Sequence, residues 1–389
     1  MFAHPLMHTA PANDVSFPQG CAIERLTLTD FRNHASFRLE TNAPEVILVG
    51  PNGAGKTNVL EAISLLTPGR GMRGARSGEI SRSGSAGGWA AAASVKGPLG
   101  DSHIGVGVDA NQTNNARKVH VDGDLHRGQA SLAERFSALW LTPQMDALFV
   151  GPSEERRRYL DRIAATSDPA HIGRVANYRN AMRQRLSLLK TGSADVVWID
   201  ALEAEMASRA VAVAAARIET AARLDAAAAR GVTEFPRARI TVKGITEDWL
   251  NQIPALEAED RLRVLLKEER RRDSETGVTS SGPHRSDMVV MDRARELSAA
   301  SGSTGEQKAL LVSLTFASAR MIKDATGCSP ALLLDEVAAH FDPNRRRVLF
   351  DEALELGGQV WITGADKSQL RELADRADWH CISQGSDKN

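Results

Sequence analysis

Cysteine and long apolar runs are scarce in this chain of 389 residues. The three cysteines, Cys21, Cys328 and Cys381, are odd in number and far apart, which argues against a disulfide framework and against a zinc cluster. They suit a reducing compartment, so we expect a cytoplasmic protein. No uncharged apolar run of about 18 residues occurs, so we expect no segment that spans a membrane.

Net charge is also low. The chain carries 48 Lys+Arg against 49 Asp+Glu, a formal net charge of -1, so a surface for nucleic acid must be a local basic patch. No aromatic residues interleave with the basic clusters, which disfavours stacking on single-stranded bases. The first twenty residues lack the basic start and continuous apolar core of a signal peptide, and we expect residues 1–21 to form a disordered tail.

A phosphate-binding loop stands out among the residues that are present. The stretch GPNGAGKTN at 50–58 matches the template G-x-x-x-x-G-K-[ST] and follows the apolar run 46–49. A buried strand, a Gly-rich turn and a helix start place backbone N–H groups around the phosphates of a nucleotide. Lys56 would reach the β/γ-phosphates of ATP, and the Thr57 hydroxyl would bind Mg²⁺. The nucleotide-binding residues expected here are Gly50, Asn52, Gly53, Ala54, Gly55, Lys56, Thr57 and Asn58. Because many nucleotide-dependent proteins share this loop, it does not identify the protein.

A second apolar run, 331–334, ends in the carboxylates Asp335 and Glu336. A run without alternation is typical of a parallel strand covered on both faces, and open α/β sheets place their chemistry at the carboxyl ends of such strands. We expect Asp335 to hold Mg²⁺ through a water molecule and Glu336 to act as the general base, with Lys56 as the other catalytic residue. Strands of this kind often end in Asp-Glu without any nucleotide, but the phosphate loop in the same chain favours the functional interpretation.

Ser303-x-x-Glu306 forms a capping box, which predicts a helix that starts here and ends near Gly327. Taken alone, it is compatible with a purely structural helix. A serine-capped helix 32 residues before Asp335 (335 − 303) is, however, the arrangement of ABC-type ATPases, in which it closes over the γ-phosphate held by the other subunit. The signature residues expected to act in this way are Ser303, Thr304, Gly305, Glu306 and Gln307. Asp342, after Phe341, resembles the D-loop of those enzymes.

The rest of the pattern suggests an α/β fold, an ABC/SMC-type P-loop ATPase head with a mixed-sheet core and an inserted helical lobe. Alternating residues predict a hairpin before the phosphate loop and further strands within 89–125. From about 130 to 275 the pattern is mostly helical, and we expect Trp198 and Trp249 in its core. The expected divisions are 22–130 and 283–389 for the discontinuous ATP-binding core, and 131–282 for the helical lobe II.

Several segments together resemble the RecF family, recombination mediators related to the SMC heads. The resemblance extends over nearly the whole chain from about residue 22, and GPHR at 282–285 followed by the signature is its most specific part. The segments that carry it are 28–33, 50–58, 142–153, 156–161, 178–185, 281–287, 303–307, 331–336 and 360–364.

The resemblance implies a cytoplasmic ATPase that dimerises on ATP and binds duplex or gapped DNA and single-strand/double-strand junctions. Such a protein would support RecA loading at gaps with RecR and possibly RecO, and the SOS response, with slow, DNA-stimulated hydrolysis for release. Arg32 and Asn33 would contact the nucleotide as in related heads, and Gln144 would stand near the metal. Thr363 stands where transporters carry a switch histidine, and His284 is either structural or part of the nucleotide or dimer site.

Two groups of arginines are candidates for DNA contact. Residues 151–190 hold nine Lys/Arg against four Asp/Glu, and residues 69–88 form a Gly/Arg/Ser-rich segment expected to be a mobile surface loop. The candidates are Arg70, Arg73, Arg76, Arg156, Arg157 and Arg158. Contacts with the DNA backbone fit them best, although a solvated or ion-paired face is the alternative.

Two other functions stay open at this stage. One is a transporter-type ABC ATPase subunit, against which Thr363 and the long helical insertion argue. The other is an SMC-like structural head that binds ATP with negligible turnover, against which an intact Glu336 argues.

Overall fold

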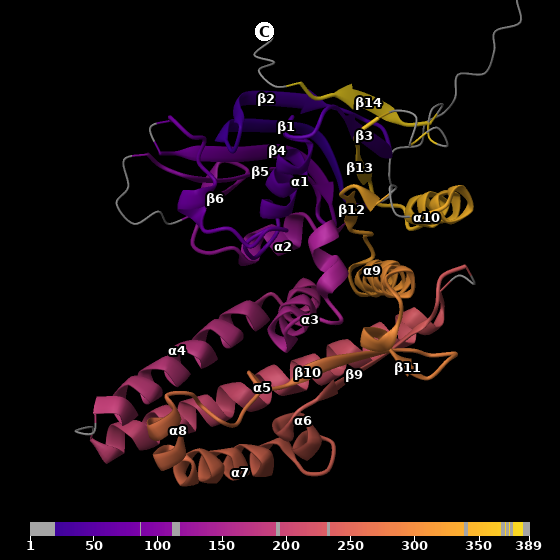
Figure 1. Cartoon of the computed structure of the whole chain (residues 1–389). Helices are drawn as coiled ribbons and strands as arrows, with labels where there is room; N and C mark the ends of the chain where they lie inside the picture. Colours follow the sequence, from indigo (N-terminus) through magenta and orange to yellow (C-terminus); the bar gives the residue numbers. More distant parts are fainter. Residues whose placement is uncertain are drawn as a thin grey trace, which may run out of the picture.

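The computed structural model describes residues 20–85, 87–110, 117–191, 195–231, 234–337, 341–366, 370, 373 and 376–383 (Figure 1). Most of the tail expected at 1–21 therefore lies outside the described residues. Gly20 and Cys21 belong to the folded chain, since their backbone amides donate to the carbonyls of Gly357 (2.8 Å) and Ser329 (2.7 Å).

A five-stranded parallel sheet in the order β14-β3-β13-β12-β8 forms the centre of the ATPase half. Its strands are β3 (Glu45–Val49), β8 (Ala138–Leu141), β12 (Ala331–Leu334), β13 (Val360–Gly364) and β14 (Asp378–Cys381). Alternate residues of β3 enter two separate cores. Val46 and Leu48 pack on the side of α1 (Lys56–Leu65), and Ile47 packs on the side of α9 (Thr304–Thr326). The continuous apolar runs thus mark strands that are covered on both faces, as predicted.

Strand β8 differs from the prediction of mostly helical structure after residue 130. Its four residues pair in parallel with β12, with Leu141 opposite Leu334. A short apolar run fits a buried strand and a buried helix equally well, so the hydrophobic periodicity of residues 138–141 could not predict a strand. The division between the lobes at residue 130 stays a prediction.

A six-stranded antiparallel sheet covers the other side of α1, so that this helix lies between two sheets (Figure 1). The hairpin of β1 and β2 confirms the predicted pair before the phosphate loop. The strands, in sheet order, are β2 (His34–Glu40), β1 (Ala22–Phe31), β4 (Trp89–Gly97), β5 (Gly100–Val108), β6 (Lys118–Val121) and β7 (Asp124–His126).

The helical lobe occupies the lower half of Figure 1 and encloses a small core of its own. Its helices are α3 (Ser153–Ser167), α4 (Ala170–Thr191), α5 (Val196–Ala229), α6 (Ile245–Leu250), α7 (Ala255–Glu268) and α8 (Arg270–Thr276). A small antiparallel sheet lies beside α5, with strands β9 (Ala238–Lys243), β10 (Asp287–Asp292) and β11 (Leu297–Ser298). The remaining elements are α2 (Ala130–Arg135), α10 (Pro343–Glu355) and the short 3-10 helices η1 (Ser77–Glu79), η2 (Pro143–Ala147) and η3 (Ala299–Ser301).

Helix α5 agrees with the mostly helical pattern expected from about 130 to 275, but the prediction for one of its tryptophans is wrong. Trp198 is 55% exposed, and its neighbour Ile199 takes the buried position in the first turn. Trp249 is partly buried against the core of the helical lobe, close to what was expected.

A fully buried arginine joins four helices of this lobe. Arg185 on α4 donates to Glu203 on α5 (2.8 Å), to Asp273 on α8 (2.6 Å) and to the carbonyl of Leu266 on α7 (2.6 Å). The three side chains of this ion network are at most 1% exposed. Buried charges of this kind are tolerated only when each is paired.

Arg185→Met should therefore destabilise the protein by about 3–5 kcal/mol, because it leaves the buried Asp273 without its cation and removes one of the two arginines that pair with Glu203. Urea unfolding followed by circular dichroism measures this change, with Arg183→Met as the control because Arg183 lies exposed on the same helix. Equal midpoints for the two variants would contradict the structural role of the network.

Candidate nucleotide-binding site

The phosphate loop leaves β3 and enters α1 in the conformation its glycines permit. Gly53 and Gly55 have φ angles of 80° and 108°, which side-chain-bearing residues rarely adopt. A Cβ atom on Gly55 would lie 2.5 Å from Nε2 of His34. Gly55 caps α1 without a side-chain hydrogen bond, so the first-turn N–H groups are available to an anion.

Lys56 is buried at 4% exposure inside this loop. Its Nζ donates to the carbonyls of Gly50 (2.7 Å) and Pro51 (3.1 Å). The ammonium group is thus held within the loop that the phosphates would enter. Pro51, Asn52 and Gly53 are exposed around it, which gives a ligand access to the loop.

The turn between β1 and β2 braces the loop from one side. Asn33 donates through Nδ2 to the carbonyl of Ala54 (3.0 Å) and accepts at Oδ1 from Nδ2 of Asn58 (2.7 Å). The structure therefore brings Asn33 into contact with the predicted nucleotide-binding residues.

Arg32, the other predicted contact in this turn, is held by the protein. Its Nε donates to Oε2 of the buried Glu61 (2.8 Å), and Nη1 donates to the carbonyl of Glu79 (2.7 Å). Glu61 also pairs with Arg73 (2.9 Å). Sequence reasoning missed Glu61, although a glutamate in a run of apolar helix residues was a visible signal.

The two nucleotide motifs meet through a single carboxylate oxygen. Oδ1 of Asp335 accepts hydrogen bonds from the hydroxyl of Thr57 (2.9 Å) and from the hydroxyl of Thr363 (2.8 Å). Thr363 Oγ1 also accepts the backbone N–H of Glu336 (2.9 Å). Glu336 is exposed and has a φ angle of 53°, an uncommon backbone conformation for a residue with a side chain.

The residues predicted to hold Mg²⁺ partly converge. Thr57 and Asp335 are in direct contact, and one hydroxyl with one carboxylate suits an ion that takes its other ligands from phosphates and water. Gln144 is exposed in η2, which follows the end of β8 beside β12. It therefore lies at the same edge of the sheet as Asp335.

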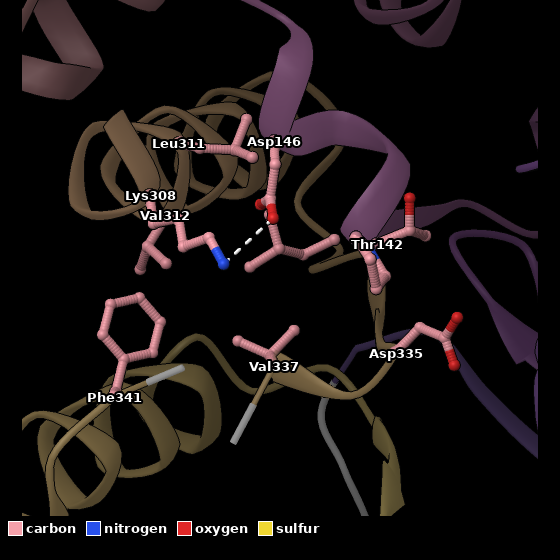
Figure 2. A pocket seen from close by; sticks show the side chains of 10 residues that line it. Thr142, Asp146, Lys308, Leu311, Val312, Asp335, Val337 and Phe341 are labelled. Atoms are coloured by element: carbon pink, nitrogen blue, oxygen red, sulfur yellow. Dashed lines mark ion pairs between the residues drawn. The ribbon is translucent and has the colours of Figure 1, made fainter. Parts of the chain in front are cut away.

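A small pocket, partly open to solvent, lies between this edge and α9 (Figure 2). Asp335 and Thr142 form one end, and Phe341 lies at the other. Lys308 on α9 forms an ion pair with Asp146 of η2 across it (3.0 Å). This pair, which the sequence did not suggest, links the signature helix to the segment that carries Gln144.

The signature residues sit at an exposed helix start. Ser303 Oγ accepts the Glu306 amide (3.4 Å) and Oε2 of Glu306 accepts the Ser303 amide (2.8 Å), which confirms the capping box. Arg295 and the Ser303 amide lower the pKa of Glu306 to about 2, so the cap stays charged at neutral pH. Ser303, Thr304 and Gly305 are exposed, and a Cβ atom on Gly305 would meet nothing within 4 Å. Gln307 is tied back to the carbonyl of Gly302 (2.8 Å).

Asp342, the expected D-loop residue, caps α10. Its Oδ1 accepts the amides of Asn344 (3.0 Å) and Arg345 (3.1 Å), and the residue is exposed. The position is compatible with both a structural cap and an interface residue.

The structure corrects the prediction for two of the DNA-contact arginines. Arg156 binds both carboxylate oxygens of Asp287 (2.7 and 2.9 Å) and three backbone carbonyls. Arg157 is 9% exposed and donates to Ser153 and to the carbonyl of Ser286. Both side chains are engaged inside the protein, which argues against direct contact with DNA.

The other four candidates differ in how far they are engaged. Arg158 is exposed but pairs with Glu154 and Glu155, and Arg73 pairs with Glu61. Among the described residues, Arg70 and Arg76 are exposed and form no ion pair. They belong to the segment 69–88, which contains η1 and is tied to the hairpin, since Arg82 pairs with Asp30 (2.7 Å).

His284 has a structural role. Its Nδ1 contacts the hydroxyl of Tyr178 (2.7 Å) and its Nε2 contacts the carbonyl of Thr279 (2.9 Å). Burial lowers the pKa of His284 to about 4, so the imidazole is neutral at pH 7. Nε2–H then donates to Thr279, and Nδ1 accepts from Tyr178.

Asn33→Ala should weaken ATP binding about tenfold, because the phosphate loop loses its hydrogen bonds to the hairpin, a change of about 1.4 kcal/mol. Titration with a fluorescent ATP analogue measures the dissociation constant. Asn251→Ala, at an exposed asparagine that ends α6, is the control. A dissociation constant within twofold of the unsubstituted protein would contradict the bracing role of Asn33.

The amino-acid sequence of this chain is similar to those of known proteins. Residues 22–379 match the family described as RecF/RecN/SMC N terminal domain. The DNA replication and repair protein RecF of Rhizobium etli is 43% identical over 370 residues, covering 95% of this chain and 99% of that protein. The protein of the same name from Mesorhizobium japonicum is 43% identical over 371 residues, covering 95% and 98%.

Solved structures agree on the fold. The recombination mediator protein RecF-ATPrS in the RecFOR pathway superposes with a TM-score of 0.81 at 21% identity, covering 91% of this chain and 95% of that one. The RecF-ATP structure gives a TM-score of 0.80 at 21% identity. The predicted head fold with its helical lobe is thus confirmed. In the part of the chain that the structure describes, the helices lack the length and hydropathy that a membrane span requires.

Proposed function

Since the chain belongs to the RecF family, we propose that it is a cytoplasmic DNA-binding ATPase of recombinational repair that dimerises on ATP. The relatives are called DNA replication and repair proteins, and the matched solved structures are called recombination mediators. Membership of the RecF family argues against the alternative function of a transporter-type ABC ATPase subunit. The division into a core at 22–130 and 283–389 and a helical lobe at 131–282 is part of the proposal.

One observation carries the proposal more than any other. The phosphate loop and the Asp335 strand are joined through Thr57, whereas the signature cap at Ser303 is exposed and points its free helix start outward. A helix N-terminus that is built, capped and uncovered suits an anion brought by another molecule. ATP held on the loop of one copy would be that anion for the Ser303 helix of the second copy.

The residues at the loop supply the parts of phosphoryl transfer. Backbone N–H groups at the start of α1 bind the phosphates, and Lys56 would leave its loop carbonyls for the β/γ-phosphates. Mg²⁺, when bound, would neutralise charge on the phosphates; Thr57 and Asp335 are the residues to hold it, with Gln144 nearby. Glu336 would orient a water and accept its proton as the water oxygen bonds to the γ-phosphorus and the bond to ADP breaks. Turnover would be slow and stimulated by DNA.

DNA contact is assigned to Arg70 and Arg76, with Arg73 and Arg158 as weaker candidates because carboxylates hold them. Contacts of this type are made to phosphates and depend on salt, not on base sequence. The partners that follow are duplex and gapped DNA, RecR and possibly RecO, and the role is support of RecA loading and the SOS response.

Glu336→Gln should form a stable dimer with ATP, because hydrolysis is blocked while both binding surfaces are kept. Sedimentation with a labelled gapped duplex should show that dimer on DNA at low salt, with affinity falling steeply as salt rises.

Arg70→Ala with Arg76→Ala should weaken the DNA complex but leave the ATP-bound dimer intact.

The matched control is the same double substitution at Arg261 and Arg263, exposed and ion-paired on α7. If Glu336→Gln stays monomeric with saturating ATP, closure over a shared site is wrong. If it dimerises but does not bind the gapped duplex at any salt, the assignment to DNA repair is wrong.

A further inference from the structure

Thr363 is the next-to-last residue of β13, the strand that lies between the phosphate-loop strand β3 and the Asp335 strand β12. Its neighbour Ile362 pairs with Leu334, and Thr363 itself pairs with Leu48. This register places the Thr363 side chain at the level of Asp335, at the sheet edge where the site lies. The residue is 0% exposed.

The Thr363 hydroxyl makes hydrogen bonds to two different residues of the candidate site, one as a donor and one as an acceptor. It donates to Oδ1 of Asp335 (2.8 Å) and accepts the backbone N–H of Glu336 (2.9 Å). A hydroxyl has one proton, so the bond to Asp335 leaves only its lone pairs for other groups. Thr363 is thus committed within the sheet and does not act as a sensor that donates to a phosphate.

The bond to the Glu336 amide acts where the backbone is strained. A φ angle of 53° is unfavourable for a glutamate and persists only where neighbouring groups hold the backbone in place. Asp335 continues the line of β12 and is buried at 5% exposure, whereas Glu336 is exposed. The turn at Glu336 therefore separates the two carboxylates, one kept at the loop and one presented to solvent.

We infer that Thr363 is a positioning residue for ATP hydrolysis. Its single hydroxyl holds the Asp335 carboxylate beside Thr57, and it also holds the backbone of Glu336 in its turned conformation. The inference rests on the proposed ATPase function. It assigns to this threonine a task inside one subunit, the alignment of the metal-holding carboxylate with the general base. A valine at 363 would fill nearly the same space and lose both hydrogen bonds.

Thr363→Val should lower kcat about 10–100-fold, as misplacement of a reacting group does, while the KM for ATP changes less than about threefold. The Mg²⁺ concentration for half-maximal ATP binding should rise, because Asp335 loses a partner. Thr363→Ser, which keeps the hydroxyl, should restore both quantities. Thr220→Val is the control, since Thr220 is a buried threonine on α5 whose hydroxyl donates to a carbonyl of its own helix (Ala216 O, 2.7 Å).

The results of these experiments distinguish a failure of the inference about Thr363 from a failure of the proposed ATPase function. If the unsubstituted protein does not hydrolyse ATP, the proposed function fails, and the Mg²⁺ dependence of ATP binding still tests Thr363. A kcat for Thr363→Val within twofold of the unsubstituted protein, or equal losses in the Val and Ser variants, would overturn the positioning role. An unchanged Mg²⁺ requirement in Thr363→Val would overturn the part that concerns Asp335.

Discussion

Oδ1 of Asp335 accepts two hydroxyl groups that reach it from different segments of the chain, Thr57 at the start of α1 and Thr363 at the end of β13. These three positions come together because β3, β13 and β12 are parallel neighbours, so that their carboxyl ends meet at one edge. The covering of both sheet faces by helices and by the antiparallel sheet keeps that edge fixed. The ATP binding and hydrolysis proposed for the ATPase half depend on this alignment.

A second set of buried polar contacts ties the helical lobe to the signature. Asp161 on α3 accepts from Arg217 on α5 (2.8 and 2.9 Å) and contacts His171 on α4 (2.8 Å). Arg156 on α3 binds Asp287 at the start of β10, the strand that leads toward α9. Arg156, which looked like part of a DNA surface, therefore joins α3 of the helical lobe to the strand that leads toward Ser303. Lys308 and Asp146 join the same helix to the nucleotide edge.

Features encoded within a few residues could be predicted from the sequence. Local sequence patterns predict the geometry of the phosphate loop, of the capping box at Ser303 and of the buried strand before Asp335. The structure confirms the geometry of all three. Features that depend on distant partners could not. Arg156 meets Asp287 at a separation of 131 positions, and nothing near Arg156 announces that carboxylate. The four residues of β8 lack the length to separate strand from helix. Trp198 follows the helical spacing of the core, yet it stands in the first turn of α5, where its side of the helix is uncovered.

Mixing two inactive variants tests most directly whether the catalytic site is shared between two copies. Lys56→Ala impairs the phosphate loop and Ser303→Arg blocks the exposed cap, so neither protein alone should hydrolyse ATP. In a mixed dimer, one site combines both defects, whereas the other combines an intact loop with an intact cap. The account predicts that ATPase activity appears on mixing and depends on the ratio of the two proteins. A mixture no more active than either variant alone, although mixed dimers form, would contradict it.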